Sequence, residues 1–292
     1  MHELPYLSLS AYLRQRFGKR VQKIPLDAGM TCPNRDGTIS RHGCAFCNPK
    51  GSGTGLYHTG EPLAVQWSHW KERLGKKYKT DLFLGYLQSY TNTYGPLERI
   101  QALLDEIVPL PGLVGICLGT RPDCIDPDKA ALLANAPVEE FWVDLGLQSS
   151  NNATLERIGR GHSAACFAQA CRLLADNGLL VCAHVMAGLP GETDADFLET
   201  VRFAAAQPIA GIKFHNLYVA QDTRIATWYH HGLYTPLTRE AYIDMLVKAL
   251  CLLPAHIVVH RLTGDPAPGE LVAPEWARQK QGLLDEIRFR LL

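Results

Sequence analysis

The sequence has no apolar run long enough to cross a bilayer, so we expect no transmembrane segment and no membrane partner. Its first residues, Met-His-Glu-Leu-Pro, lack the basic segment followed by a hydrophobic one that marks a secretory signal. No internal repeat, low-complexity tract or obvious linker interrupts it. The nine cysteines are odd in number and scattered, which fits a reducing cytosol better than a disulfide framework. These absences predict a cytoplasmic location and favour a cytosolic enzyme.

The chain also lacks net charge, but its 29 basic and 29 acidic residues are unevenly distributed. Residues 1–80 hold 13 Lys or Arg against 5 Asp or Glu. Most of this basic excess lies in two runs: Arg14, Arg16, Lys19, Arg20 and Lys23, then Lys71, Arg73, Lys76, Lys77 and Lys79. Such runs are typical either of a protein that binds a phosphate-bearing partner or of solvated helix faces. The sequence leaves both interpretations open.

Three cysteines stand close together in a polar, turn-rich stretch: Cys32, Cys44 and Cys47. No fourth Cys or His follows at zinc-finger spacing, whereas a structural zinc site normally fills four positions. Thiolates also hold iron–sulfur clusters, and a cubane held by three of them leaves one iron open to a ligand. Two other interpretations remain, namely ordinary buried thiols or a zinc site completed by a distant His42 or His58.

Apolar, β-rich segments alternate with helical patterns along the chain. The predicted strands lie near residues 21–26, 82–87, 114–118, 141–145, 179–186 and 211–219, and the helices near 61–78, 96–108, 127–136, 151–177 and 193–206. This alternation predicts right-handed βαβ units and a parallel sheet. We therefore expect an α/β fold, a partial (βα)6 TIM-like barrel with N- and C-terminal helical extensions. Residues 1–292 would form one domain, with the barrel at about 20–220 and an extension at about 221–292.

Polar residues follow each predicted strand. The three-cysteine loop follows the first, and the later strand ends carry polar residues within 88–94, 119–123, 146–149, 184–191 and 215–216. In parallel barrels, catalytic groups lie at the carboxyl ends of the strands. Because every strand end carries such a group, the sequence predicts an active site at this edge of the barrel.

Four motifs in a fixed order give the chain a resemblance to a known family. They are Cys32…Cys44-x-x-Cys47, Tyr90-Thr91-Asn92-Thr93-Tyr94, Gly119-Thr120-Arg121-Pro122-Asp123-Cys124 and His260-Arg261-Leu262-Thr263-Gly264-Asp265. With these motifs the chain resembles radical S-adenosylmethionine (SAM) enzymes of the YhcC/YtqA type. It is also distantly similar to the radical SAM domain of the Elongator catalytic subunit. The resemblance covers nearly the whole chain, from Leu7 to the C-terminal helix.

The chain departs from the common radical SAM pattern at two points. Eleven residues separate Cys32 from Cys44, where the common motif has three, and this longer gap matches the YhcC/YtqA type. The Gly-Gly-Glu motif that usually follows the second strand is absent, and Gln88, Ser89, Tyr90 and Thr91 take its place.

The resemblance implies a [4Fe–4S] cluster with Cys32, Cys44 and Cys47 as its metal ligands and SAM on the open iron. One-electron reduction, by a donor such as a flavodoxin or ferredoxin, would cleave SAM and give a 5′-deoxyadenosyl radical. That radical would abstract a hydrogen atom from the substrate. The protein would orient the cofactor and exclude water and stray hydrogen donors.

The resemblance also implies a set of SAM-binding residues, expected at the strand ends. These are Gln88, Ser89, Thr91, Arg121, Gln148, Arg160 and His184. Gln148 would lie near the ribose, and Arg160 would pair with the SAM carboxylate, for which guanidinium has the matching geometry. The sequence also allows Arg160 to be a solvated residue and His184 to be part of the barrel wall.

A second set would face the substrate: Tyr90, Asp123, His260, Arg261 and Asp265. The last three lie where polar residues, Gly and Pro gather, and this composition predicts a substrate-facing loop over 260–265.

The resemblance points to tRNA as the substrate, with modification of the side chain at C5 of the wobble uridine. The basic N-terminal third is compatible with such a partner. An alternative is a radical SAM enzyme that acts on a small metabolite or a protein, and a non-enzymatic alternative is an iron–sulfur electron-transfer or scaffold protein.

Overall fold

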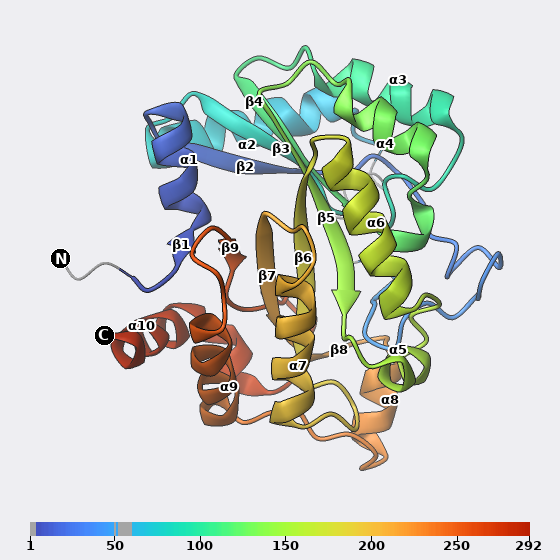
Figure 1. The fold of residues 1–292 in the computed structure, drawn as a ribbon, viewed down its shortest axis with the longest axis vertical. Coiled ribbons are helices and arrows are strands. Elements are labelled where there is room, and N and C mark those ends of the chain that lie inside the picture. Colours follow the sequence, from blue (N-terminus) through green and yellow to red (C-terminus); the bar gives the residue numbers. More distant parts are fainter. Residues whose placement is uncertain (1–3, 50, 52–59) are drawn as a thin grey trace.

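The structure is a computed structural model that describes residues 4–49, 51 and 60–292. Its centre is an eight-stranded parallel sheet that curls into a half-barrel, in the spatial order β1-β9-β7-β6-β5-β4-β3-β2 (Figure 1). The strands are β1 (Leu7–Ser8), β2 (Val21–Leu26), β3 (Leu82–Leu87), β4 (Leu113–Thr120), β5 (Glu140–Gln148), β6 (Leu180–Ala187), β7 (Gly211–Asn216) and β9 (Val258–Arg261). A separate antiparallel pair joins β8 (Val219–Ala220) to β10 (Leu271–Ala273).

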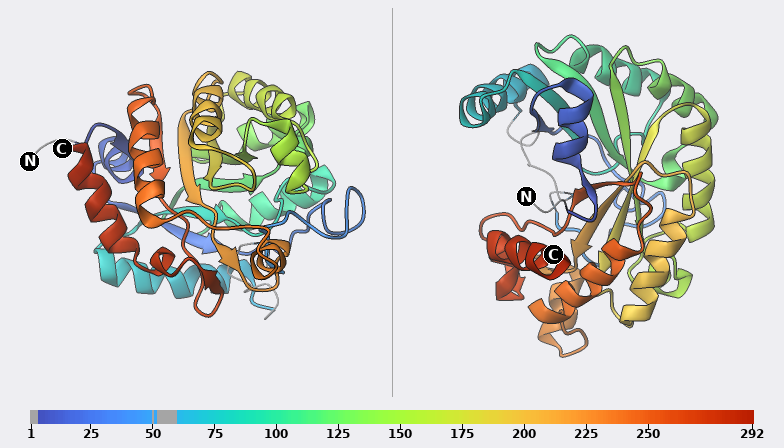
Figure 2. Two further views of the ribbon diagram at one scale, coloured as in Figure 1. Left: turned by 90° about the horizontal axis from the view of Figure 1, so that it is seen from below. Right: turned by 60° about the vertical axis from the view of Figure 1, so that its left-hand side comes forward.

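Helices flank the curled sheet, most of them on its outer face and the first at one end of the lumen (Figure 2). They are α1 (Leu9–Phe17), α2 (Leu63–Tyr78), α3 (Leu97–Ile107), α4 (Pro127–Ala134), α5 (Asn152–Arg157), α6 (Ala164–Asp176), α7 (Asp194–Ala205), α8 (Arg224–His230), α9 (Arg239–Cys251) and α10 (Lys280–Leu291). Their apolar stripes explain this arrangement. On α6, for example, Phe167, Cys171 and Leu174 recur at helical spacing and are fully buried in the main core. Burial of each such large side chain contributes about 1.5–3 kcal/mol.

The predicted fold class is confirmed, because the six predicted strands form the continuous parallel series from β2 to β7. Strands β2 and β3 begin and end at the predicted residues. Two further strands, β1 and β9, extend the sheet beyond β7.

The single helix predicted over 151–177 is wrong, because the chain forms α5 and α6 with a break between them. Gly159 and Gly161 in this break have φ of 67° and 79°, a left-handed conformation that ends a helix. The Ser163 side chain then accepts a hydrogen bond from the Cys166 backbone and caps the start of α6.

The loop predicted over 260–265 is wrong for its first two residues. His260 and Arg261 form the end of β9, which follows the buried residue Ile257 and pairs with β7. The short β-branched run 257–259 is the signal of this strand in the sequence.

The amino-terminal end of the barrel lumen is filled by side chains and covered by α1. Leu13 of α1 packs among inward-facing residues of the strands. The Tyr12 ring lies 5.7 Å from the Trp142 ring, edge to face, and its hydroxyl donates to Glu140. The cavity that holds the cysteine loop lies at the opposite end, at the carboxyl ends of the strands.

Candidate functional site

The cysteine loop follows β2 and is held by its own backbone. Arg35 N donates to Cys32 O at 2.9 Å, Gly43 N to Asn34 O at 2.7 Å, and Cys47 N to Cys44 O at 3.1 Å. Gly43 has a φ of 69°, which few residues other than glycine adopt. These bonds fold the unusually long gap between the first two cysteines into a compact turn.

The far side of the loop is anchored to neighbouring elements. Ala45 N donates to Ile158 O at 2.8 Å, and Ala45 O accepts from Ile225 N at 3.0 Å. The Ala45 side chain is fully buried in a second apolar cluster with Leu155 and Leu217. The loop therefore has a fixed position over the open end of the barrel.

All three cysteines line one cavity of about 860 Å³ at this end of the barrel. The Cys44 sulfur accepts from Asn34 Nδ2 at 3.4 Å and from Arg160 Nη1 at 3.5 Å. Burial alone would raise the pKa of Cys44, but Arg160, Arg121 and Asn34 outweigh it and lower this pKa below its usual value. These neighbours therefore stabilise the thiolate form of Cys44, the form that binds metals.

Cys47 is held through its backbone by Arg35. The Arg35 guanidinium donates to Cys47 O at 2.8 Å and to Asn48 O at 2.5 Å. Burial and the nearby Cys44 raise the pKa of Cys47, and the Arg35 charge only partly opposes this. A bound metal would supply the missing positive charge, because coordination deprotonates a thiol.

This donor set fits an iron–sulfur cluster better than a closed zinc site. Three thiols line the cavity, and two N–H donors point at one of their sulfurs, as hydrogen bonds to cluster ligands do. Among the described residues that line the cavity, His42 is not found. His58 lies outside the described residues.

Most of the other predicted site residues line the same cavity: Gln88, Tyr90, Thr91, Arg121, Gln148, Arg160, His184, Arg261 and Asp265. Two of them have strained backbones, with φ of 59° at Tyr90 and 75° at Gln148. Strain of this kind in non-glycine residues is concentrated at functional sites. At Gln148 it accompanies an irregular register between β5 and β6.

Three predicted site residues are not among those that line the cavity. Ser89 is buried, and Asp123 forms a two-pronged ion pair with Arg121 at 2.9 and 2.7 Å. His260 lies deeper in the lumen, where its ring is 4.4 Å from the Trp142 ring and its Nδ1 is 3.4 Å from Lys23 Nζ. The geometry gives Asp123 a clear part in orienting Arg121 and gives His260 a packing position.

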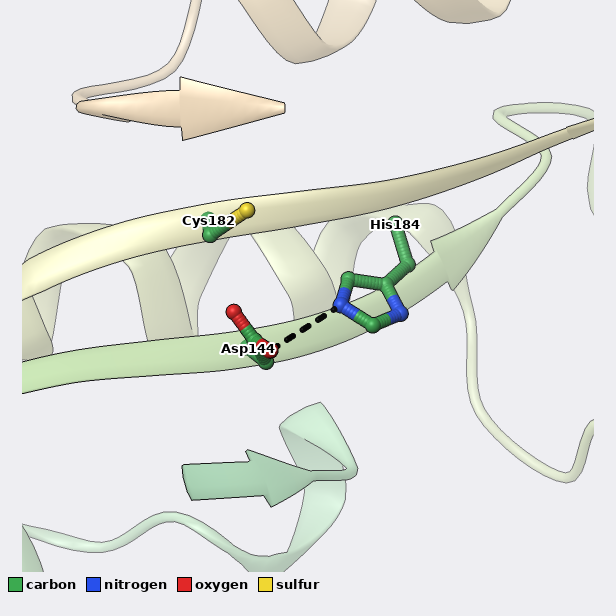
Figure 3. Close-up of side chains that lie close together, drawn as sticks. All are labelled: Asp144, Cys182 and His184. Carbon is green, nitrogen blue, oxygen red and sulfur yellow. Dashed lines mark ion pairs between the residues drawn. The ribbon is translucent and has the colours of Figure 1, made fainter. Parts of the chain in front are cut away.

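A polar layer at the floor of the cavity includes two charged residues, Asp144 and Lys213, that were not among the predicted site residues. Asp144 of β5 pairs with Lys213 of β7, and Lys213 Nζ also lies 3.0 Å from the Tyr86 hydroxyl. Figure 3 shows His184 beside Asp144, with Nε2 at 3.5 Å from Oδ2. A charged residue inside an otherwise apolar predicted strand, as in 141–145, is the signal that could have revealed this layer.

Asp144, His184 and Cys182 also lie close enough to be considered as metal ligands, with ligand atoms within 4.8 Å of one another (Figure 3). The ammonium of Lys213 already binds Asp144. Burial and Asp144 raise the pKa of Cys182 well above its usual value, so its thiol stays protonated. The positive charge here comes from the chain itself, which argues against a metal ion.

Comparison with known proteins agrees with the site. The description "Radical SAM superfamily" matches residues 37–204, and "Radical_SAM C-terminal domain" matches residues 209–292. Bacillus subtilis YtqA is 34% identical over 99% of this chain and 90% of its own length. Escherichia coli YhcC is 33% identical over 95% of this chain and 89% of its own. A tRNA uridine(34) acetyltransferase of Dehalococcoides mccartyi is 29% identical over 60% of this chain and 38% of its own.

Solved structures share the fold. Elp3 of the archaeon Methanocaldococcus infernus superposes with a TM-score of 0.69 and 20% identity, over 91% of this chain and 63% of that one. Methylornithine synthase superposes with a TM-score of 0.56 and 12% identity, over 95% of this chain and 84% of that one. No helix in the described part of the chain is long and apolar enough to span a membrane. The chain belongs to the radical SAM superfamily and is a radical SAM enzyme, whose cofactors are a [4Fe–4S] cluster and SAM.

Proposed function

We propose that this enzyme modifies the side chain of the wobble uridine of tRNA, with Cys32, Cys44 and Cys47 as the cluster ligands. The observation that supports this most is the match to a tRNA uridine(34) acetyltransferase over 60% of the chain, combined with a cavity that holds all three cysteines. When bound, the cluster and SAM supply a 5′-deoxyadenosyl radical after one-electron reduction. A flavodoxin or ferredoxin is the proposed reductant.

Polar side chains on the cavity wall are the proposed SAM contacts. Gln88, Thr91 and Gln148 line the cavity beside the cysteines and offer neutral donors and acceptors. Arg121 and Arg160 add positive charge that suits the SAM carboxylate, and Asp123 orients Arg121. With neutral contacts from one set of residues and positive charge from the two arginines, the chain would hold SAM without a Gly-Gly-Glu motif.

The two basic runs differ in how well they support a tRNA partner. Lys19 and Arg20 directly precede β2, at the edge opposite the cavity, and Lys23 lies inside the lumen beside His260. The second run, which begins at Lys71 in α2, is better placed. Trp70 of α2 lines the cavity, and the Arg73 guanidinium lies over the Trp70 ring at 5.3 Å. Phosphates bound by this part of α2 would therefore lie close to the cavity.

The nucleoside profile of tRNA tests this proposal. Total tRNA from a strain that lacks the gene should accumulate a less processed side chain at position 34. A plasmid copy of the wild type should restore the profile, and a Cys44→Ala copy should not. A Cys166→Ala copy, changed at a thiol outside the cavity, is the matched control and should restore it.

An unchanged profile in the deletion strain would refute the tRNA substrate. Binding gives an independent measure, because phosphate contacts make affinity fall steeply with salt. Absence of tRNA binding at low salt would count equally against the proposal and would favour a metabolite or protein substrate.

A further inference from the structure

Arg261, the last residue of β9, lines the cavity but has no counter-ion among the described residues. In the sheet, β9 lies toward the edge opposite β2, the strand that the cysteine loop follows. The Arg261 side chain is half-buried, and no hydrogen-bond acceptor or carboxylate in the described part of the chain bonds to its guanidinium. Because a charged group kept from water is normally paired, an unpaired guanidinium at a cavity points to an anionic ligand.

Three carboxylates on the same part of the cavity wall leave this arginine without a partner. Asp265 pairs with Lys280 of α10. Glu270 accepts a hydrogen bond from Asn48 Nδ2 at 2.6 Å. Asp222 lines the cavity too, but it is exposed to solvent and forms no ion pair within the described ranges. The chain therefore provides no counter-charge on this side of the cavity.

The lumen below Arg261 has more positive than negative charge. Lys213 binds Asp144 there, and together they form a neutral pair. Lys23 Nζ lies 3.4 Å from His260 Nδ1 and has no carboxylate partner among residues that the structure describes. Two cations, Lys23 and Arg261, thus remain without an acidic partner. An uncompensated charge shielded from water is destabilising, and an anion bound in the cavity would offset it.

The charge of Arg261 acts on several side chains around the cavity. Burial, Lys213 and Arg261 lower the pKa of His184 on β6 to about 4. Burial, His184 and Arg261 lower the pKa of His215 on β7 well below its usual value. At Tyr218 burial raises the pKa, and the Arg261 charge opposes this. These three residues line the cavity, so the guanidinium lies among groups that a ligand in the cavity would contact.

SAM also carries a carboxylate, but two other arginines are better placed to hold it. Arg160 Nη1 lies 3.5 Å from the Cys44 sulfur, and the Arg121 charge helps to lower the pKa of Cys44. Both arginines therefore lie beside the proposed cluster site, whereas Arg261 ends a strand near the other edge of the sheet. Arg261 is thus left for a different anion.

We propose that Arg261 is a receptor for an anionic oxygen group of the substrate, a carboxylate or a phosphate. A guanidinium matches both groups, because its fork of N–H donors binds two oxygens at once. The inference rests on the proposed tRNA substrate and specifies one contact that this substrate makes. The wobble nucleotide has two sources for the anion, namely a carboxylate on its C5 side chain and its own backbone phosphate.

Equilibrium binding under anaerobic conditions, with the cluster-loaded protein, tests the proposal and identifies the source. Three anticodon stem-loop RNAs are compared, with uridine, 5-carboxymethyluridine or the uncharged 5-carbamoylmethyluridine at position 34. If the anion is the side-chain carboxylate, the wild type should bind the carboxymethyl RNA about tenfold more tightly than the others, as expected for a charge-assisted hydrogen bond. Arg261→Gln should lose this preference.

If the anion is a phosphate, the wild type should bind the three RNAs alike, and Arg261→Gln should weaken all of them by a similar factor. The slope of log affinity against log salt should then decrease by about one. Arg172→Gln, at an exposed position of α6, is the matched control and should bind as the wild type does. Binding by Arg261→Gln that equals the wild type for every RNA would overturn the proposal.

Equilibrium dialysis with SAM separates this contact from the cofactor site. Arg261→Gln and Arg261→Lys, which keeps the charge but lacks the fork, should both bind SAM as the wild type does. Weaker SAM binding in both variants, with an unchanged urea midpoint of unfolding, would assign Arg261 to SAM and overturn the proposal.

The proposed function can fail separately from this inference. If neither the stem-loops nor tRNA from the deletion strain binds the wild type at low salt, the tRNA substrate is refuted. Inorganic phosphate then serves as a probe of the cavity without RNA. Its phosphorus NMR signal should broaden with the wild type and less with Arg261→Gln, and the absence of any difference between the two proteins would overturn the anion receptor as well.

Discussion

Arg160 Nη1 lies 3.5 Å from the sulfur of Cys44, although 116 residues separate the two along the chain. The same guanidinium donates through Nη2 to Gly146 O at 2.8 Å, and Arg160 is only 7% exposed. Asn34, inside the long gap between the first two cysteines, donates to the same sulfur at 3.4 Å. Cys44, a proposed cluster ligand, therefore has two hydrogen-bond donors at its sulfur, the charged Arg160 and the neutral Asn34, which come from different parts of the chain.

The first prediction concerns these two donors. N–H groups that point at a cluster sulfur favour the reduced, more negative cluster. Asn34→Ala and Arg160→Lys should therefore each shift the reduction potential of the reconstituted cluster to more negative values, as measured by spectroelectrochemistry without SAM. Loss of such outer contacts also weakens metal binding by about 10- to 100-fold. Arg202→Lys, on the exposed face of α7, is the control, and an unshifted potential in both variants would contradict the assignment.

The same pair distinguishes two uses of Arg160. If Arg160 also holds the SAM carboxylate, Arg160→Lys should weaken SAM binding while Asn34→Ala leaves it nearly unchanged. Equilibrium dialysis with SAM measures both. If the two variants bound SAM with equal affinity, Arg160 would have no part in holding the SAM carboxylate, and its role would be the hydrogen bond to the Cys44 sulfur.

A second prediction concerns the buried pair Asp144 and Lys213. Removal of one partner leaves the other charge buried and alone, which costs about 3–5 kcal/mol. Lys213→Met should thus lower the free energy of unfolding by about that amount. The double variant Asp144→Leu/Lys213→Met should lose much less, because no lone charge remains. Urea unfolding of the wild type, Asp144→Leu, Lys213→Met and the double variant gives the coupling energy, and strictly additive losses would show that the pair is not coupled.

A third prediction follows from the lumen histidines. Burial and the charge of Lys213 lower the pKa of His184 to about 4 from 6.5, against the opposing effect of Asp144. At this histidine the unfolded chain therefore binds a proton more readily than the folded chain does. The stability that neutral His184 contributes is complete above pH 6.5 and is lost as the pH falls toward 4. The loss amounts to about 3 kcal/mol.

Urea unfolding of the cluster-free protein between pH 4 and 7 measures this loss. His184→Gln should reduce the pH dependence without abolishing it, because the pKa values of His215 and His260 are lowered in the same direction. His256→Gln, at an exposed position, should leave it unchanged. A stability that rises as the pH falls would have the wrong sign for this account.

A fourth prediction concerns the strained backbone at Gln148. A non-glycine residue in the left-handed region costs about 1–2 kcal/mol, which glycine avoids. Gln148→Gly should therefore be more stable than Gln148→Ala by about 1 kcal/mol. Both variants remove the amide and should weaken SAM binding alike. If Gln148→Ala bound SAM as the wild type does, Gln148 would have no part in the cofactor site.

Much of the fold could be predicted because its signals are local. The apolar runs of β2 and β3 end at turn-forming or polar residues, so their bounds follow from the sequence. Parallel strands bring their carboxyl ends to one edge, and this rule alone gathers Gln88, Arg121 and Gln148 at one cavity. Their roles as SAM contacts stay predictions.

The contacts across the lumen could not be predicted, because they depend on how the strands align in the assembled sheet. The pairing of Asp144 with Lys213 joins two strands that are not adjacent in the sheet, since β6 lies between them. Sequence periodicity shows that each residue faces inward but gives no partner across the lumen. The position of His260 depends likewise on β9, a short strand whose pairing with β7 only the assembled sheet reveals.

Mössbauer spectroscopy of the anaerobically reconstituted protein, with and without SAM, tests the central claim most directly. The wild type should show a [4Fe–4S] cluster in which one iron changes its signal when SAM is added, because three thiolates leave one iron open. Alanine at Cys32, Cys44 or Cys47 should each abolish the cluster, and Cys166→Ala should retain it. A complete, SAM-responsive cluster in any one of the three single variants would contradict the account.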